Sequence, residues 1–131
     1  MCMIDNSDGP LEMYDSKIVK GRKEHRCNEC GRTLLRGESH ELVTGKFDGT
    51  FVAYRTCIHC LVAVKWLRTE CGGHIFTGVQ EDIEEHLAEG YGLGVARLAV
   101  GMRRKWLRFD GGGLMPVPRM PKLAPASATE G

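Results

Sequence analysis

Hydrophobic and polar residues are interleaved over two neighbouring stretches of the chain, 41–47 and 50–55. Such interleaving is typical of β-strands that bury one face. Asp48-Gly49 joins the two stretches, and an Asp-Gly pair accepts the positive φ angles of a tight two-residue turn. The pattern therefore predicts a β-hairpin.

Downstream, hydrophobic positions recur with a helical period. A first helix is expected to start near Cys57, with Thr56 as its N-cap, and to stop at Gly72-Gly73. A second is expected to start at Thr77-Gly78-Val79-Gln80, because this segment matches a capping box, and to end at Gly90.

A third helix is predicted over residues 95–109, where an apolar stripe lies opposite a basic one. Gly101 falls inside it and should weaken it by about 1 kcal/mol relative to Ala. We expect the last two helices to pack on each other, with the first completing the core. The packing residues would be Val79, Ile83, Leu87, Leu98, Met102 and Trp106.

Two cysteine pairs frame the predicted hairpin: Cys27 with Cys30, and Cys57 with Cys60. Two residues lie between the cysteines of each pair, so both thiolates can reach one ion, and two pairs complete a tetrahedral four-thiolate shell. We predict one structural Zn²⁺ held by these four cysteines, with iron as the competing metal.

Disulfides are the alternative use of such pairs. They need an oxidising compartment, whereas the first residues, Met-Cys-Met-Ile-Asp-Asn, lack the apolar region of a secretory signal. No stretch approaches the roughly 18 apolar residues of a membrane span. We therefore expect a reducing cytoplasm. Cys71 should pack against the end of the first helix rather than bind the metal, and Cys2 should be a free thiol.

The predicted elements give an α+β fold built on a treble-clef zinc module, in which a knuckle, a hairpin and a helix supply the ligands. Its expected parts are an N-terminal arm over 1–22, the zinc module over 23–73, a helical extension over 74–110 and a flexible Gly/Pro-rich tail over 111–131.

Catalysis is not favoured by these residues. Four-thiolate zinc leaves no coordination position for a catalytic water. An HNH-like nuclease on the same scaffold needs catalytic histidines, and here the hairpin offers only His40 and Asp48, without a His-Asn-His order. We accordingly expect no small-molecule substrate and no catalytic residues.

Direct binding of nucleic acid stays open. The net charge of +1 lacks the basic excess typical of such proteins, and aromatic residues make up only 7% of the chain, so stacking platforms are sparse. The basic residues are nevertheless unevenly distributed. Those that we predict to contact a partner are Arg32, Arg36, Arg97, Arg104, Lys105 and Arg108.

Three segments resemble small zinc proteins of bacteriophages and prophages: 25–38 around the first cysteine pair, the Thr44-Gly-Lys-Phe-Asp-Gly hairpin, and Tyr54-Arg-Thr-Cys-Ile-His-Cys. Trp66-Leu-Arg-Thr-Glu-Cys-Gly-Gly and Gly101-Met-Arg-Arg-Lys-Trp are also similar to that group. The resemblance implies a phage context, and with it the cytoplasm of a bacterial host, where small phage proteins often bind a host machine. It carries no catalytic residues.

Together these observations predict a non-enzymatic accessory protein that binds and modulates a host protein or protein–nucleic-acid complex, such as a transcription or defence machine. The expected effect is inhibition. The alternatives are a regulatory zinc protein that binds DNA or RNA directly and, after it, an HNH-like nuclease. No membrane partner is expected.

Overall fold

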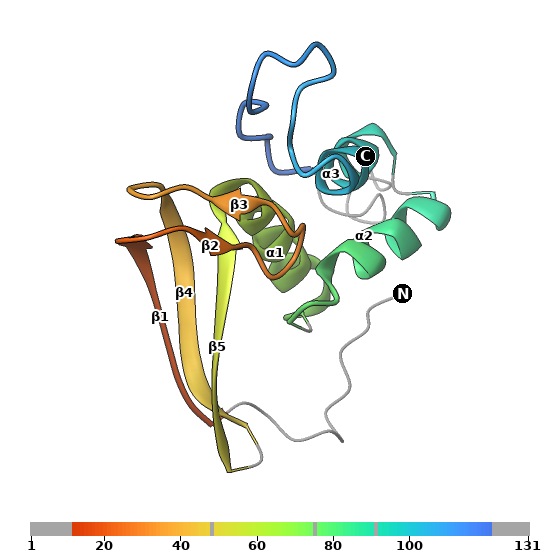
Figure 1. The fold of residues 1–131 in the computed structure, drawn as a ribbon. Coiled ribbons are helices and arrows are strands. Elements are labelled where there is room, and N and C mark those ends of the chain that lie inside the picture. Colours follow the sequence, from red (N-terminus) through yellow and green to blue (C-terminus); the bar gives the residue numbers. More distant parts are fainter. Residues whose placement is uncertain (1–11, 48, 75, 91, 122–131) are drawn as a thin grey trace.

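The computed structural model describes residues 12–47, 49–74, 76–90 and 92–121. Five strands precede three helices, which confirms the predicted α+β class (Figure 1). The elements are β1 (Glu12–Lys20), β2 (His25–Arg26), β3 (Thr33–Leu34), β4 (Ser39–Phe47), β5 (Thr50–Cys57), α1 (Ile58–Cys71), α2 (Val79–Ala88) and α3 (Leu93–Arg103). Cys2 and residues 122–131 of the expected tail lie outside the described residues.

The predicted hairpin is confirmed as the antiparallel pair β4–β5, in which Phe47 lies opposite Thr50. Gly49 has φ +81°, the left-handed conformation that the tight turn requires. β1 adds a third antiparallel strand along the other side of β4, so the sheet order is β1-β4-β5. Residues 12–20 were expected to belong to an arm, so this strand was not predicted.

The predicted knuckle is a short hairpin formed by β2 and β3, and the first helix follows β5 directly, as in a treble clef. Helix α1 is capped by Cys57, whose sulfur accepts from the backbone N–H of Cys60, so the prediction of Thr56 as N-cap is wrong. The helix ends where predicted, because Gly72 takes φ +83° and its N–H donates to the Arg68 carbonyl.

The predicted capping box of α2 does not form. Thr77 has φ +68°, and Gly78 is the N-cap residue, which has no side chain to accept a hydrogen bond. Among the expected packing residues, Leu87 is 37% exposed, whereas His86 from the same turn is buried. The apolar face of α2 is therefore rotated by one residue near its C-terminal end.

Helix α3 ends at Arg103, so the prediction that it continues to residue 109 is wrong. Lys105 and Trp106 adopt positive φ angles of +56° and +60°, which turn the chain back across the helix. The Trp106 ring then lies over Gly101, in the space where a Cβ atom would stand. Gly101 is thus required by packing, which outweighs its cost in helix propensity.

One hydrophobic core joins the predicted zinc module to the helical extension. It contains all four cysteines of the two pairs, the indole rings of Trp66 and Trp106, and apolar side chains from α1, α2 and α3. Val79, Ile83, Leu98, Met102 and Trp106 are buried there as expected. The following segment returns over this core, with a bridge between Leu107 and Leu114 and a hydrogen bond from Met115 N–H to the Trp106 carbonyl.

Within the described parts of the chain, none of the helices combines the length and the apolar character needed to cross a lipid bilayer.

Replacing Gly101 with Ala tests the packing of Trp106. Helix propensity alone would stabilise the variant by about 1 kcal/mol. Because the new methyl group would overlap the indole ring, we expect the opposite sign, a loss of about 1–3 kcal/mol in the free energy of unfolding by urea. Val100→Ala, at an exposed neighbouring position, is the control and should change stability by under about 0.5 kcal/mol. A stabilised Gly101→Ala protein would show that Trp106 packs elsewhere.

Candidate metal centre

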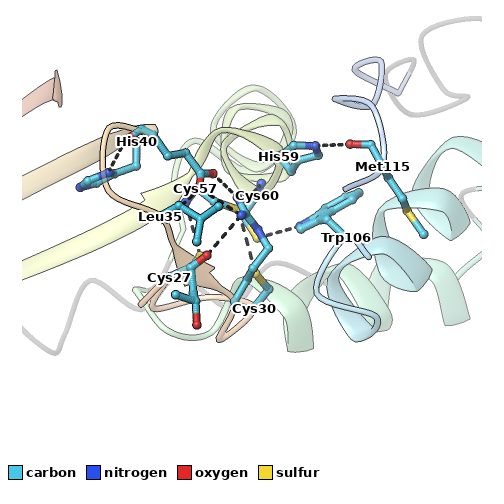
Figure 2. Close-up of polar contacts among 12 residues, drawn as sticks. Cys27, Cys30, Leu35, His40, Cys57, His59, Cys60, Trp106 and Met115 are labelled. Atoms are coloured by element: carbon cyan, nitrogen blue, oxygen red, sulfur yellow. Dashed lines mark hydrogen bonds and ion pairs between the residues drawn. The ribbon is translucent and has the colours of Figure 1, made fainter. Parts of the chain in front are cut away.

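Four cysteine sulfurs meet at the junction of the knuckle, the hairpin and α1 (Figure 2). Cys27 and Cys30 lie in the turn between β2 and β3, Cys57 ends β5, and Cys60 lies in the first turn of α1. All four Sγ atoms are within 4.8 Å of one another, and those of Cys30 and Cys57 are 4.0 Å apart. The structure thus brings together the four predicted ligands.

Backbone hydrogen bonds fix the knuckle. The N–H of Cys27 donates to the Arg32 carbonyl at 2.9 Å, and the N–H of Gly31 donates back to the Cys27 carbonyl at 3.0 Å. Gly31 has φ +82°, the conformation that closes this turn. As a result, Cys27 and Cys30 present their side chains to the same point.

Asn28 fastens the knuckle to β5. Its N–H donates to the Arg55 carbonyl at 2.8 Å, and its side-chain oxygen accepts from the Arg55 N–H at 2.6 Å. This reciprocal pair lies two residues before Cys57. It therefore sets the distance between the two cysteine pairs independently of any metal.

Four N–H groups point at the sulfurs. Those of Glu29 and Cys57 donate to Cys27 Sγ at 3.4 Å, and that of Cys60 donates to Cys57 Sγ at 3.3 Å. The fourth donor is the indole Nε1–H of Trp106, 3.2 Å from Cys60 Sγ (Figure 2). Because donors of this kind stabilise negative charge on sulfur, the site is arranged for thiolates.

Burial and thiol hydrogen bonding move the cysteine pKa values apart. Hydrogen bonds from Cys30, Cys57 and Cys60 lower the pKa of Cys27, so the cluster favours a thiolate at that sulfur. Burial raises the pKa of Cys60. A bound cation would replace the remaining thiol protons, because thiolates are the form of cysteine that binds metal.

The geometry fits a tetrahedral metal ion. Metal–sulfur bonds of about 2.3 Å place tetrahedral sulfurs roughly 3.8 Å apart. The 4.0 Å separation of Cys30 and Cys57 is close to this value, and the 4.8 Å limit for the whole set requires only small movements. Each cysteine is at most 7% exposed, so such a site would be closed to solvent.

Glu29, between the two knuckle cysteines, links the centre to α2. Its carboxylate accepts from the backbone N–H groups of Thr77 at 2.8 Å and Val79 at 3.1 Å, and so replaces the missing capping box. Burial raises the pKa of Glu29 to about 7, while these two donors act in the opposite direction because they stabilise the carboxylate. A negative group at this helix end is also favoured by the helix dipole.

His59 and His40, which lie near the four cysteines, bond to groups other than the cysteine sulfurs. His59 points from α1 towards the C-terminal segment, where its Nε2–H donates to the Met115 carbonyl at 2.5 Å (Figure 2). His40 is fully buried and bonds to Arg55. Among the described residues, the candidate metal-binding group consists of the four cysteines alone, and Cys71 packs at the edge of the core as expected.

The predicted partner-binding residues differ in their exposure and contacts. Arg32 is buried, and its guanidinium pairs with Glu38 at 2.5 Å, so its place is structural rather than exposed. Because α3 ends at Arg103, Arg97 lies on the helix, whereas the other three basic residues expected on the same helical face lie beyond its end. Arg104 lies over the Phe109 ring at 3.7 Å, Arg108 pairs with Asp110 at 3.1 Å, and Arg36, Arg97 and Lys105 are exposed.

Sequence reasoning missed three residues that support the centre: Asn28, Glu29 and Trp106 in its role as a donor to sulfur. The residue types gave no distinctive signal, because Asn, Glu and Trp act here through partners far away in the sequence.

Comparison with known proteins gives no assignment: no family model matches the chain, and neither a curated protein nor a solved structure matches it. The resemblance to phage zinc proteins therefore stays a prediction.

Glu29→Ala tests the link between the centre and α2. The substitution leaves two N–H groups without their acceptor at a buried position, so we expect a loss of about 1–3 kcal/mol in unfolding free energy. Amide exchange at Val79 should also become faster. The control is Glu81→Ala, which removes an exposed acidic residue from the first turn of the same helix and should cost less than about 1 kcal/mol. Equal losses in both variants would contradict the capping role.

Proposed function

We propose that this protein is a zinc-stabilised binding protein without catalytic activity, which engages a protein or protein–nucleic-acid complex of a bacterial host. The observation that carries the proposal is the burial of all four thiols at the meeting point of the whole fold. Zn²⁺ suits this set because it favours tetrahedral thiolate coordination. With four protein ligands, the ion would be closed to water and substrate, so its contribution is structural.

A groove beside the knuckle supports binding to a protein. It has a volume of about 450 Å³ and lies between the knuckle and the segment that follows α3. Leu35, Leu107 and Leu114 line it and are 58%, 49% and 39% exposed. Exposed apolar side chains gathered in this way often mark an interaction site.

The charges of this groove indicate the chemistry of the partner. Arg26 and Lys105 lie at its wall, whereas its acidic residue, Glu38, is already paired with Arg32. We therefore propose that the groove receives a segment with apolar side chains next to carboxylates, since complementary charge orients and accelerates association. Of the predicted partner-binding residues, Arg32 and Lys105 line this groove.

Metal analysis tests the zinc part of the proposal. Purified protein should contain one zinc per chain, and Cys30→Ser should lose it and unfold, because the metal contributes folding free energy. Trp106→Phe keeps an aromatic ring in the core but lacks the N–H that donates to Cys60. It should retain zinc and release it to a chelator roughly tenfold faster or more. A Cys30→Ser protein that keeps both its zinc and its melting temperature would overturn the assignment.

Affinity capture from nuclease-treated bacterial lysate tests the groove. The double variant Leu35→Glu/Lys105→Glu should capture at least about tenfold less of the partner that the unchanged protein enriches, because it places negative charge in an apolar, basic groove. Leu93→Glu/Lys65→Glu makes the same chemical changes at exposed positions elsewhere and should capture normally. Zinc content should be equal in all three proteins. Equal capture by both double variants would contradict binding through the groove.

A further inference from the structure

Among the described residues, the face of the main sheet opposite α1 is open along most of its length: Lys17, Thr44 and Phe51 are exposed there, whereas His40 is buried. Val43 of β4 is fully buried on the α1 side, and Glu41 on the same side lies 3.8 Å from Arg68 of α1. Because side chains alternate along a strand, Leu42 points to the other face. There it forms a cross-strand row with Lys17 of β1 and Arg55 of β5.

This open face contains a basic hollow of about 620 Å³. Its lining includes five Lys or Arg residues and His25, and no acidic residue. The five are Lys17, Lys20, Arg22, Lys23 and Arg55. Between described residues, the structure forms no ion pair from any of these five to a carboxylate. The exposed acidic residues nearest in sequence, Asp15 and Glu24, do not line the hollow. Its positive charge is thus available to an anion.

The hollow is held in shape by buried contacts. Arg55 Nη1 donates to Nε2 of the fully buried His40 at 2.7 Å, and His40 Nδ1–H donates to the Glu38 carbonyl at 3.3 Å. This tautomer follows because arginine can only donate. Gly21 packs so closely against His25 and His40 that a Cβ atom would contact both rings. The basic loop and the Arg55 guanidinium are therefore positioned in advance.

An exposed aromatic ring lies further along the same face. Phe51 is four residues before Arg55 on β5, so it shares that face, and its side chain is 73% exposed. Lys46 on β4 lies opposite it, with Nζ 5.8 Å from the ring centroid. Four residues of strand span about 13 Å. The sugar–phosphate backbone of a flexible strand could therefore place phosphates in the hollow while one of its bases reaches the Phe51 ring.

We propose that this face binds single-stranded nucleic acid, with backbone phosphates in the basic hollow and a base stacked on Phe51. Cations that follow a backbone and aromatic rings on which bases stack are the two features of such sites. The site goes beyond the proposed protein-binding groove, with which it shares no lining residue. The two proposals can therefore fail independently.

Fluorescence anisotropy with labelled single-stranded RNA and DNA of about 12 nucleotides tests the site, at about 50 mM and about 200 mM salt. Lys20→Glu/Lys23→Glu should weaken binding at low salt by at least about tenfold and make the salt dependence shallower, because fewer counterions are released. The control Lys65→Glu/Arg119→Glu produces the same net charge from exposed positions outside the hollow. It should stay within about threefold of the unchanged protein, because distant exposed charges are screened.

Phe51→Ala should weaken binding by about fivefold or more without changing the salt dependence, because it removes stacking and no charge. Phe109→Ala removes a similarly exposed ring, 76% accessible, and should bind normally. Zinc content and melting temperature should be unchanged in all these variants, whose substituted side chains are exposed.

Three results would overturn the proposal. Equal losses in the two charge-reversed proteins would indicate diffuse attraction to net charge. Full competition by inorganic phosphate, together with normal binding by Phe51→Ala, would indicate a pocket for a small phosphate compound. Tighter binding of a duplex than of either single strand would exclude the stacking geometry.

Discussion

The convergence of four buried thiols is the constraint on which the rest of this structure depends. The sulfurs come from the knuckle, from the end of β5 and from α1, and the donors around them include the indole of Trp106 from beyond α3. The same knuckle caps α2 through Glu29. Thiolates packed this closely repel one another, so a cation at their centre would neutralise charge and join every element of the core at once. A metal here would accordingly determine how the helices pack as well as whether the knuckle closes.

The parts of the fold that the sequence predicted are those governed by local rules. Gly49 and Gly72 act through their own backbone angles, so the hairpin turn and the end of α1 could be placed without knowing any distant contact. The spacing within each cysteine pair is equally local, because two residues between cysteines already fix the reach of both sulfurs. The four candidate ligands followed from this spacing.

The parts that were not predicted depend on residues far apart in the sequence. The capping box gives way to Glu29, which lies 48 residues earlier and accepts from the Thr77 N–H that Gln80 would otherwise have bound. Helix α3 ends early because Trp106 must turn back to place its ring over Gly101 and its N–H at Cys60. β1 gains its backbone partners only when β4 is beside it, and its polar composition gives little sign of a strand. Each case is a tertiary contact that outweighs a local preference.

The knuckle also determines how the two proposed binding surfaces are related. His25 lines the basic hollow, whereas the next residue of β2, Arg26, lines the apolar groove. Neighbouring residues of a strand point in opposite directions, so this short strand separates a surface suited to phosphates from one suited to a protein segment. Both surfaces are positioned by strands that lead directly to cysteines: β2 to Cys27 and β5 to Cys57. A partner made of protein and nucleic acid could therefore be held on both sides of one knuckle, and loss of the metal would disturb both sides together.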